Sequence, residues 1–255
     1  MYYQSNALYD YLKRRNITKF EFTSKNLWQL VYGDSRANPK LLVVVSGVKA
    51  REIYAEPSAE ERKACKRLKQ LSSLTKVPML FIRFTVDRDV ENVYIYNNKN
   101  KNFTVMTMDK LAQLYKEFGL PVRKGSTSKY LNDKASSAYH KWQRNSLGKD
   151  LSVTDIDLMK IDLTKDAIIE IYELKRSYIS LSKWEPYEDD YKNFRLLGNL
   201  LSGTGIPLKI VYNVRKTKPN LNDDISKLKI FKVDVTKEKL IEYESTIQLE
   251  EFIRR

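Results

Sequence analysis

The chain has 255 residues, of which 42% are hydrophobic and 31% charged, a balance typical of globular proteins that excludes a disordered chain. A lone cysteine, Cys65, excludes a disulfide scaffold, and no apolar run approaches the roughly 20 residues that span a membrane, so we expect a cytoplasmic protein without a membrane segment. The 46 basic and 32 acidic side chains give a net charge of +14, which favours a polyanionic partner, most often nucleic acid.

Hydrophobic periodicity predicts the elements of the first half in chain order. A helix over 5–15 is followed by strands near 27–32 and 40–46. A second helix begins after Pro57, where Ser58 and Glu61 form a capping box. Its apolar face contains Ala64, Leu68 and Leu71. Strands at 78–84 and 92–96 follow, and then a last helix that ends at Gly119.

The second half repeats this order at a nearly constant offset. The predicted elements are a helix over 130–145, strands at 151–160 and 167–175, a helix over 187–201, strands at 208–214 and 228–233, and a final helix. Pro207 follows Pro78 by 129 residues, and Leu240 follows Leu111 by 129. A linker rich in Pro, Gly and Ser lies at about 120–129. We therefore predict two tandem α/β domains, 1–124 and 125–255, with mixed central sheets flanked by helices.

Charged side chains interrupt two apolar strands of the second half. Because residues two apart on a strand face the same side, Asp155 and Asp157 share one face, and Glu173 and Lys175 share another on the next strand. Adjacent strands can then bring Asp157, Glu173 and Lys175 together. Two carboxylates repel each other unless they are protonated or bridged by a cation, and oxygen ligands of this kind suit magnesium.

At these residues the sequence resembles the PD-(D/E)XK nucleases, the restriction-endonuclease-like superfamily. Their pattern is an Asp on one strand and an acid, any residue and Lys on the next, and the order of elements from 130 to 214 also resembles their core. The resemblance implies that Asp157, Glu173 and the carbonyl of Leu174 bind Mg²⁺, with Mn²⁺ as a substitute, and that Lys175 orients the attacking water. No Pro precedes the first Asp, which leaves Asp155 as a rival ligand. We favour Asp157 because its neighbours are apolar.

Three further residues of the second half are candidate additions to this site. Many PD-(D/E)XK nucleases take one more acid from the first helix, a place that Asp133 could fill, although the helix dipole alone explains an acid there. His140, the only histidine, could approach a phosphate from the same helix, although a lone histidine more often packs or lies at the surface. Asp190 could assist the metal shell, although an acid at a helix start is also favoured by the dipole.

The corresponding place in the first half lacks the acids. Gly47 stands two residues before Lys49, where the motif needs a glutamate, so we interpret this half as a non-catalytic copy. Residues 1–128 carry a net charge of +11, which suggests that this half holds DNA. The candidate nucleic-acid contacts, whose alternative role is a solvated helix face, are Arg62, Lys63, Lys66, Arg67 and Lys69 on one helix and Lys13, Arg14 and Arg15 on another.

Together these features predict a magnesium-dependent endonuclease that hydrolyses phosphodiester bonds in DNA rather than RNA. Two alternatives stay open. One is a non-catalytic nucleic-acid-binding protein with a fossil nuclease site. The other is a metal-independent RNA-processing endonuclease, whose chemistry would use Tyr, His and Lys. A double-strand break needs two active centres, and a homodimer of this chain would supply the second.

Overall fold

The computed structural model describes residues 6–86, 90–123, 125, 137–216 and 222–255. The chain divides into two compact units. The central unit is Thr23–Asp155, and the terminal unit combines Met1–Phe22 with Ile156–Arg255. Within the described ranges, no helix is both long and apolar enough to cross a bilayer.

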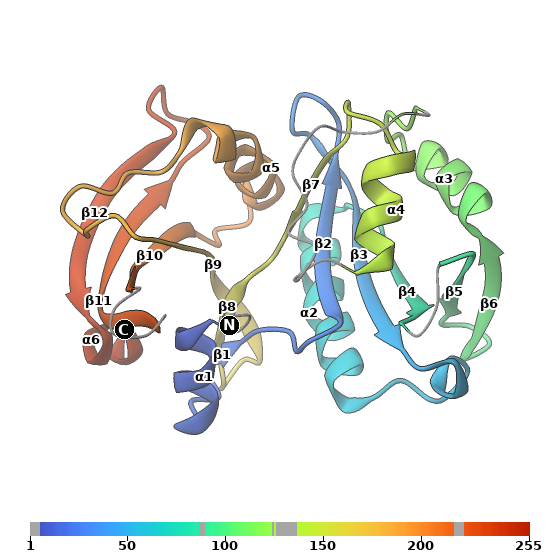
Figure 1. The fold of residues 1–255 in the computed structure, drawn as a ribbon, viewed down its shortest axis with the longest axis horizontal. Helices are drawn as coiled ribbons and strands as arrows, with labels where there is room; N and C mark the ends of the chain where they lie inside the picture. Colours follow the sequence, from blue (N-terminus) through green and yellow to red (C-terminus); the bar gives the residue numbers. More distant parts are fainter. Residues whose placement is uncertain (1–5, 87–89, 124, 126–136, 217–221) are drawn as a thin grey trace. The chain divides into compact units, whose positions relative to one another are not determined.

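The central unit is built on a six-stranded mixed sheet with the order β6-β5-β4-β3-β2-β7 (Figure 1). Its strands are β2 (Leu27–Gly33), β3 (Pro39–Val48), β4 (Met79–Thr85), β5 (Asn92–Asn97), β6 (Asn102–Thr107) and β7 (Ser152–Asp155). Strands β3 and β4 are parallel, and the other neighbours are antiparallel. Its helices are η1 (Ala50–Glu52), α2 (Ala59–Thr75), α3 (Met108–Glu117) and α4 (Ala138–Ser146).

Helices cover both faces of the central sheet. The predicted capping box starts α2: Ser58 N–H donates to Glu61, and Glu61 N–H donates to Ser58. The apolar residues of this helix are buried as predicted. Helices α3 and α4 lie across the sheet from α2 (Figure 1) and meet at a buried pair of tyrosines, where the hydroxyls of Tyr115 and Tyr139 are 2.6 Å apart.

The terminal unit is built on a second six-stranded mixed sheet, in the order β1-β8-β9-β10-β11-β12. Its strands are β1 (Phe20–Glu21), β8 (Leu158–Asp162), β9 (Ala167–Ser177), β10 (Leu208–Lys216), β11 (Asn222–Val233) and β12 (Ile241–Gln248). Its helices are α1 (Ala7–Arg14), η2 (Glu188–Asp190), α5 (Tyr191–Leu201) and α6 (Leu249–Arg254). Helices α1 and α6 contribute Leu8, Leu12 and Phe252 to one core cluster, and α5 packs on β10.

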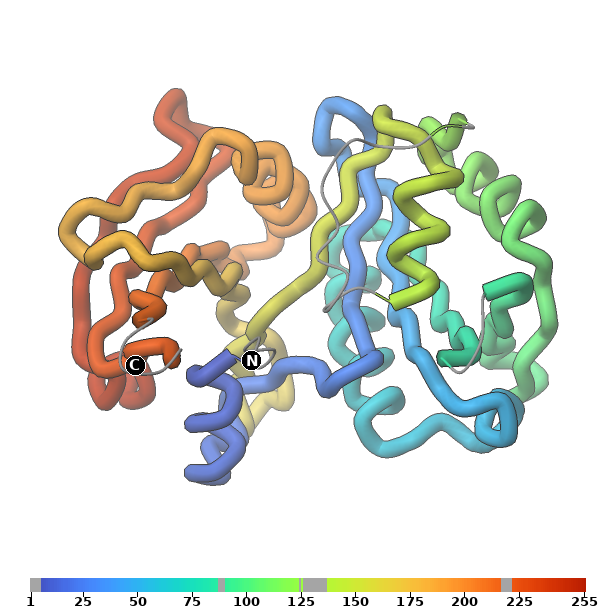
Figure 2. The backbone as a smooth tube through the Cα atoms, viewed as in Figure 1, coloured from blue at the N-terminus to red at the C-terminus, as the bar shows by residue number. Residues whose placement is uncertain are grey.

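The two sheets follow one plan, in which the first strand of each half of the sequence pairs in the unit built from the other half. Strand β1 pairs antiparallel with β8, and β7 pairs antiparallel with β2 (Figure 2). From β8 to β12 in the terminal sheet, and from β2 to β6 in the central sheet, the successive pairs of neighbouring strands are antiparallel, parallel, antiparallel and antiparallel. The helices preceding these strands are exchanged as well, because α1 packs in the terminal core and α4 in the central core.

The predicted fold class, α/β with mixed sheets flanked by helices, is confirmed. The compact units differ from the predicted ranges 1–124 and 125–255 because of the exchanged helices and strands. Part of the predicted linker lies outside the described residues. The predicted strand 151–160 is two strands, β7 and β8, which belong to different units.

The end of each half also differs from the prediction. Sequence pattern places the final helix of the second half around Leu240, but that residue precedes strand β12, and α6 starts only at Leu249. Leu111 lies within helix α3, so Leu111 and Leu240 are not structural equivalents. Pro78 and Pro207, in contrast, each directly precede the strand that runs parallel to its neighbour.

Candidate functional site

The terminal unit brings Asp157 to the Glu-Leu-Lys segment of β9. Strand β8 begins at Leu158, which lies opposite Tyr172, and Asp157 immediately precedes it. The Asp157 carboxylate accepts a hydrogen bond from the Leu174 N–H at 2.7 Å. On the other side, the Tyr9 hydroxyl of α1 donates to the Asp157 carbonyl at 2.7 Å. Asp157 is therefore held between β9 and the exchanged helix.

Lys175 joins two carboxylates into one charged cluster. Its Nζ lies 3.1 Å from Glu173 Oε1 and 3.2 Å from Asp190 Oδ2. The Glu173 side chain is 6% exposed, and those of Lys175 and Asp190 are 21% and 25% exposed. Burial acts to lower the pKa of Lys175, but the neighbouring carboxylates, led by Glu173 and Asp190, outweigh it and raise that pKa. The ammonium is therefore charged at neutral pH.

The donor set of this cluster suits a hard divalent cation. Carboxylates of Asp157, Glu173 and Asp190 and the Leu174 carbonyl are oxygen ligands of the type that magnesium takes. In the parts of the chain that the structure describes, no three His, Cys, Asp or Glu side chains are gathered as a ready-made metal site. The Lys175 ammonium already forms ion pairs with Glu173 and Asp190, so a divalent ion would compete with it for these carboxylates.

Two of the other predicted additions, Asp155 and His140, lie in the central unit. Asp155 ends β7 opposite Leu30 in the central unit, so it shares neither a strand nor a unit with Asp157, contrary to the expectation that both project from one strand. His140 also belongs to the central unit, where its ring packs edge-on against Trp28 at 4.7 Å and burial lowers its pKa. Asp133 lies outside the described residues.

Strand register identifies the counterparts of the site in the central unit. Val44 of β3 lies opposite the third residue of β4, as Glu173 of β9 lies opposite the third residue of β10. In the same way, Ser46 lies opposite the fifth residue of β4, and Lys175 lies opposite the fifth residue of β10. Gln29, which precedes Leu30 of β2, corresponds to Asp157 and donates to the Ala64 carbonyl at 3.0 Å. The expected alignment of Gly47 and Lys49 with the motif is therefore wrong, because Lys49 follows the end of β3.

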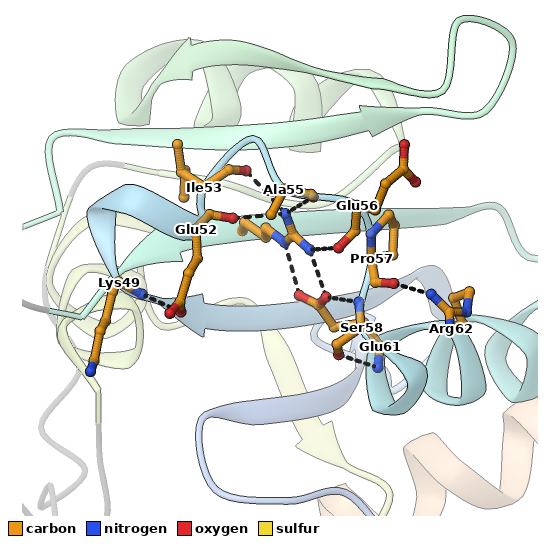
Figure 3. Close-up of polar contacts among 10 residues, drawn as sticks. Lys49, Glu52, Ile53, Ala55, Glu56, Pro57, Ser58, Glu61 and Arg62 are labelled. Atoms are coloured by element: carbon orange, nitrogen blue, oxygen red, sulfur yellow. Dashed lines mark hydrogen bonds and ion pairs between the residues drawn. The ribbon is translucent and has the colours of Figure 1, made fainter.

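An internal ion pair replaces the acidic cluster in the central unit. Arg83, whose side chain is 2% exposed, lies 2.6 Å from Glu61, and Glu61 precedes Pro78 by the same 17 residues that separate Asp190 from Pro207. The guanidinium also donates to the carbonyls of Glu52 and Ile53 at 3.1 Å, within the ring of carbonyls seen in Figure 3. This pair fixes the loop that precedes α2. It does not place two carboxylates beside a lysine, as Glu173 and Asp190 are placed beside Lys175 in the terminal unit.

The predicted basic contacts separate into exposed and buried side chains. Arg62, Lys63, Lys66 and Lys69 are exposed on α2. Arg67 is 4% exposed and donates to Gln70 at 3.2 Å, so it is a core residue rather than a nucleic-acid contact. The other predicted cluster, Lys13, Arg14 and Arg15, is exposed on α1 and thus belongs to the terminal unit. The central unit contains 24 basic and 13 acidic side chains, a net charge of +11.

Tyr9 is the residue of this site that the sequence did not indicate. It matches Tyr139 at an offset of 130, which by itself is evidence only for the repeat. The helices do not support this equivalence, since the buried residues are Leu8 and Leu12 on α1 and Tyr139 and Gln143 on α4, so Leu8 rather than Tyr9 occupies the position of Tyr139. The exchange of helices brings Tyr9, rather than Tyr139, to Asp157.

Comparison with known proteins identifies no relative that indicates a function. No known protein family and no curated protein matches the chain. Among solved structures, it is weakly similar to a sex pheromone precursor from Lactobacillus salivarius subsp. salivarius UCC118, with 8% identity over 82% of this chain and 61% of that one and a TM-score of 0.17. The C-terminal domain of the sex pheromone staph-cAM373 precursor from Staphylococcus aureus gives 7% identity over 85% and 69%, with a TM-score of 0.14. Similarity this low carries no argument about fold or function.

Proposed function

We propose that the terminal unit is the catalytic part of a metal-dependent endonuclease that hydrolyses phosphodiester bonds in DNA, and that the central unit helps to hold the DNA without catalysing. The observation that carries this proposal is the cluster of Asp157, immediately before β8, with Glu173 and Lys175 of the adjoining strand β9. Burying a carboxylate such as that of Glu173 costs free energy of folding, and charged groups of this kind are typical of functional sites. The net charge of +14 suits a polyanionic substrate.

Each residue of the cluster has a distinct part in this proposal. Asp157, Glu173 and the Leu174 carbonyl would hold Mg²⁺ or Mn²⁺. A bound ion would supply positive charge that polarises the phosphate and activates water. Lys175 would orient the attacking water and contact the phosphate, and Asp190, at 3.2 Å, would position its ammonium. Tyr9 would fix the backbone of Asp157 through its 2.7 Å hydrogen bond.

A second candidate is a nucleic-acid-binding protein with a fossil site. It is favoured by the Lys175 ammonium, which already pairs with one oxygen each of Glu173 and Asp190 without any metal. It is disfavoured by the retention of Asp157, Glu173 and Lys175, since the central unit has Gln29, Val44 and Ser46 in the equivalent places. A site under no selection would be expected to lose its charges in the same way.

A cleavage panel separates the candidates. Linear, supercoiled, branched and single-stranded DNA and an RNA are incubated with magnesium, manganese or a chelator. The proposal predicts cleavage of DNA with either ion and none with the chelator. Nicked rather than linear product from the supercoiled plasmid would indicate one centre acting alone, and linear product would indicate two copies acting together. Binding without cleavage under every condition would establish the fossil site, and chelator-resistant RNA cleavage would establish metal-independent RNA processing.

A further inference from the structure

The segment between Lys175 and Asp190 is a closed surface loop that begins and ends at the candidate site. Residues 176–189, here called the aromatic loop, comprise the last two residues of β9, the connection that follows and the first two residues of η2, directly before α5 (Figure 1). Its two ends are joined by the ion pair between Lys175 and Asp190 at 3.2 Å. Compact surface loops with adjoining ends are frequently functional.

The aromatic loop is anchored to the sheet by side chains of two strands. The Tyr212 hydroxyl of β10 lies 2.9 Å from Ser177 Oγ and donates to the Ser177 carbonyl at 3.1 Å. The Trp184 ring of the loop stacks on Tyr212, with the ring centres 4.0 Å apart and the planes 1° from parallel. Lys229 of β11 donates to the Trp184 carbonyl at 2.6 Å. The loop therefore has a fixed conformation.

Two tyrosine rings of this loop face solvent although they are held in place. Tyr178 is 61% exposed and Tyr187 is 49% exposed. The Tyr178 hydroxyl lies near the Arg215 guanidinium and helps to raise its pKa, and the Tyr187 ring packs edge-on against Trp184 with the ring centres 6.2 Å apart. Rings ordered before binding lose little entropy on binding, so they are efficient contact surfaces.

We propose that the aromatic loop is a stacking platform for unpaired bases, and that the substrate class is single-stranded DNA or DNA with an unpaired segment beside the cleaved phosphate. Tyr178 and Tyr187 lie three residues from Lys175 and Asp190, respectively, so bases stacked on them belong to nucleotides near the cluster. The loop does not attract phosphates by charge, because it carries Glu185, Glu188 and Asp189 against Arg176 and Lys183. Its contact with nucleic acid is therefore through π-faces, which every base offers. The link to cleavage rests on the proposed function, whereas the binding does not.

Binding in the presence of a chelator tests this inference without any catalysis. Fluorescence anisotropy compares a single-stranded DNA oligonucleotide, its duplex and an abasic oligonucleotide of the same length. The single strand should bind more tightly than the other two. Tyr178→Ala and Tyr187→Ala should each weaken binding of the single strand by about tenfold and leave binding of the abasic strand unchanged. Tyr178→Phe and Tyr187→Phe keep the rings and should retain at least most of the affinity.

The control is Tyr243→Ala, which removes a tyrosine that is 57% exposed on the edge strand β12 and should leave binding unchanged. Equal affinity for the single and abasic strands would overturn the inference, and so would equal losses on both ligands in the two alanine variants. Cleavage is measured on the same preparations. Binding that depends on the rings without any cleavage would contradict the proposed catalysis and support the stacking platform. Cleavage together with binding that does not depend on the rings would contradict the stacking platform alone.

Discussion

Arg83 and Tyr212 occupy the same position in the two sheets, the fifth residue of the strand that runs parallel to its neighbour, and both hold the loop that precedes the crossover helix. Arg83 does so by donating to the carbonyls of Glu52 and Ile53, and Tyr212 by donating to the carbonyl of Ser177. The partners opposite them differ, since Arg83 faces Ser46 and Tyr212 faces Lys175. In the central unit, a buried ion pair is thus used for structure. In the terminal unit, the neutral side chain of Tyr212 takes the place of Arg83, and the acids Glu173 and Asp190 pair with Lys175.

The Glu61–Arg83 pair predicts an acid-sensitive central unit. Burial acts to raise the pKa of Glu61, but hydrogen bonds from Arg83 and Ser46 outweigh it and hold that pKa below its ordinary value of 4.5. Because the pKa of Glu61 is lower in the folded protein than its ordinary value, the ionised carboxylate stabilises the fold above pH 4.5. This stabilisation is lost as the pH falls below that value and the carboxylate becomes protonated. Glu61→Gln leaves the buried guanidinium without its charge partner and should lower the free energy of unfolding at neutral pH by about 3–5 kcal/mol.

Urea unfolding at neutral and acidic pH checks this prediction. Glu61→Gln should lose stability less steeply than the parent on acidification, because it has no carboxyl group to protonate at this place. The matched control is Glu56→Gln, which alters an exposed carboxylate of the same loop and should behave like the parent. An acid profile of Glu61→Gln that parallels the parent at every pH would contradict the assignment.

The exchange of α1 and β1 for α4 and β7 predicts how the chain can be divided. A fragment 23–155 contains every strand of the central sheet and should fold alone. A fragment 1–124 lacks β7 and α4, so the central core around Leu30 is left without the packing of Tyr139, and the fragment should be poorly structured. Dispersion of amide signals in NMR spectra of the two fragments checks the difference. A well-dispersed spectrum for 1–124 and a collapsed one for 23–155 would show that the exchange is not a property of the folded chain.

Sequence pattern predicted the type of most elements and the members of the cluster, because both depend on local spacing. The capping box of α2 and the alternation in β9 could be recognised within a few residues. The exchange could not, because periodicity indicates what a segment forms but not which strand it pairs with. Strand β1 has only two residues, Phe20–Glu21, and gives no periodic signal of its own.

Two errors at the candidate site have the same origin. Asp155 and Asp157 read as one strand because two short alternating stretches, 151–154 and 155–158, follow each other directly. The alternation breaks at Thr154–Asp155, beside the point where the chain passes from one unit to the other at Ile156, but such a break does not tell which sheet each stretch joins. In the first half, Lys49 matches the motif by residue type, and strand pairing instead places Ser46 opposite the residue that corresponds to Tyr212. Register between strands, which is a tertiary property, decides both cases.

The Lys175 ammonium predicts a competition between folding and metal binding. Lys175→Met leaves the buried Glu173 carboxylate without its cation, so the free energy of unfolding should fall by about 3 kcal/mol. Magnesium should then raise the melting temperature of the variant more than that of the parent, because no ammonium opposes the ion. Thermal unfolding with and without magnesium measures both effects. Lys183→Met, at an exposed lysine of the aromatic loop, is the control, and a magnesium response equal to that of the parent would count against a metal site here.

The exposed basic side of α2 predicts salt-dependent DNA binding by the central unit. Reversing the charge of Lys63, Lys66 and Lys69 should weaken DNA binding and flatten its dependence on salt, with the logarithmic slope falling by about 0.9 for each phosphate that the protein no longer neutralises. Arg67→Met should instead lower stability, since Arg67 is buried. Titrations at several salt concentrations check the slope. If the triple variant binds like the parent at every concentration, this face is only solvated.

The central claim is that Asp157 and Glu173 are the metal ligands of a phosphodiester hydrolase, and the most direct test is the rate of DNA cleavage in magnesium by four proteins. These are the parent, Asp157→Asn, Glu173→Gln and, as the control, Asp155→Asn, which alters an exposed acid of the central unit. Asp157→Asn and Glu173→Gln should cleave no faster than a protein-free sample, and Asp155→Asn should cleave like the parent. Cleavage at the parental rate by both Asp157→Asn and Glu173→Gln would contradict the claim.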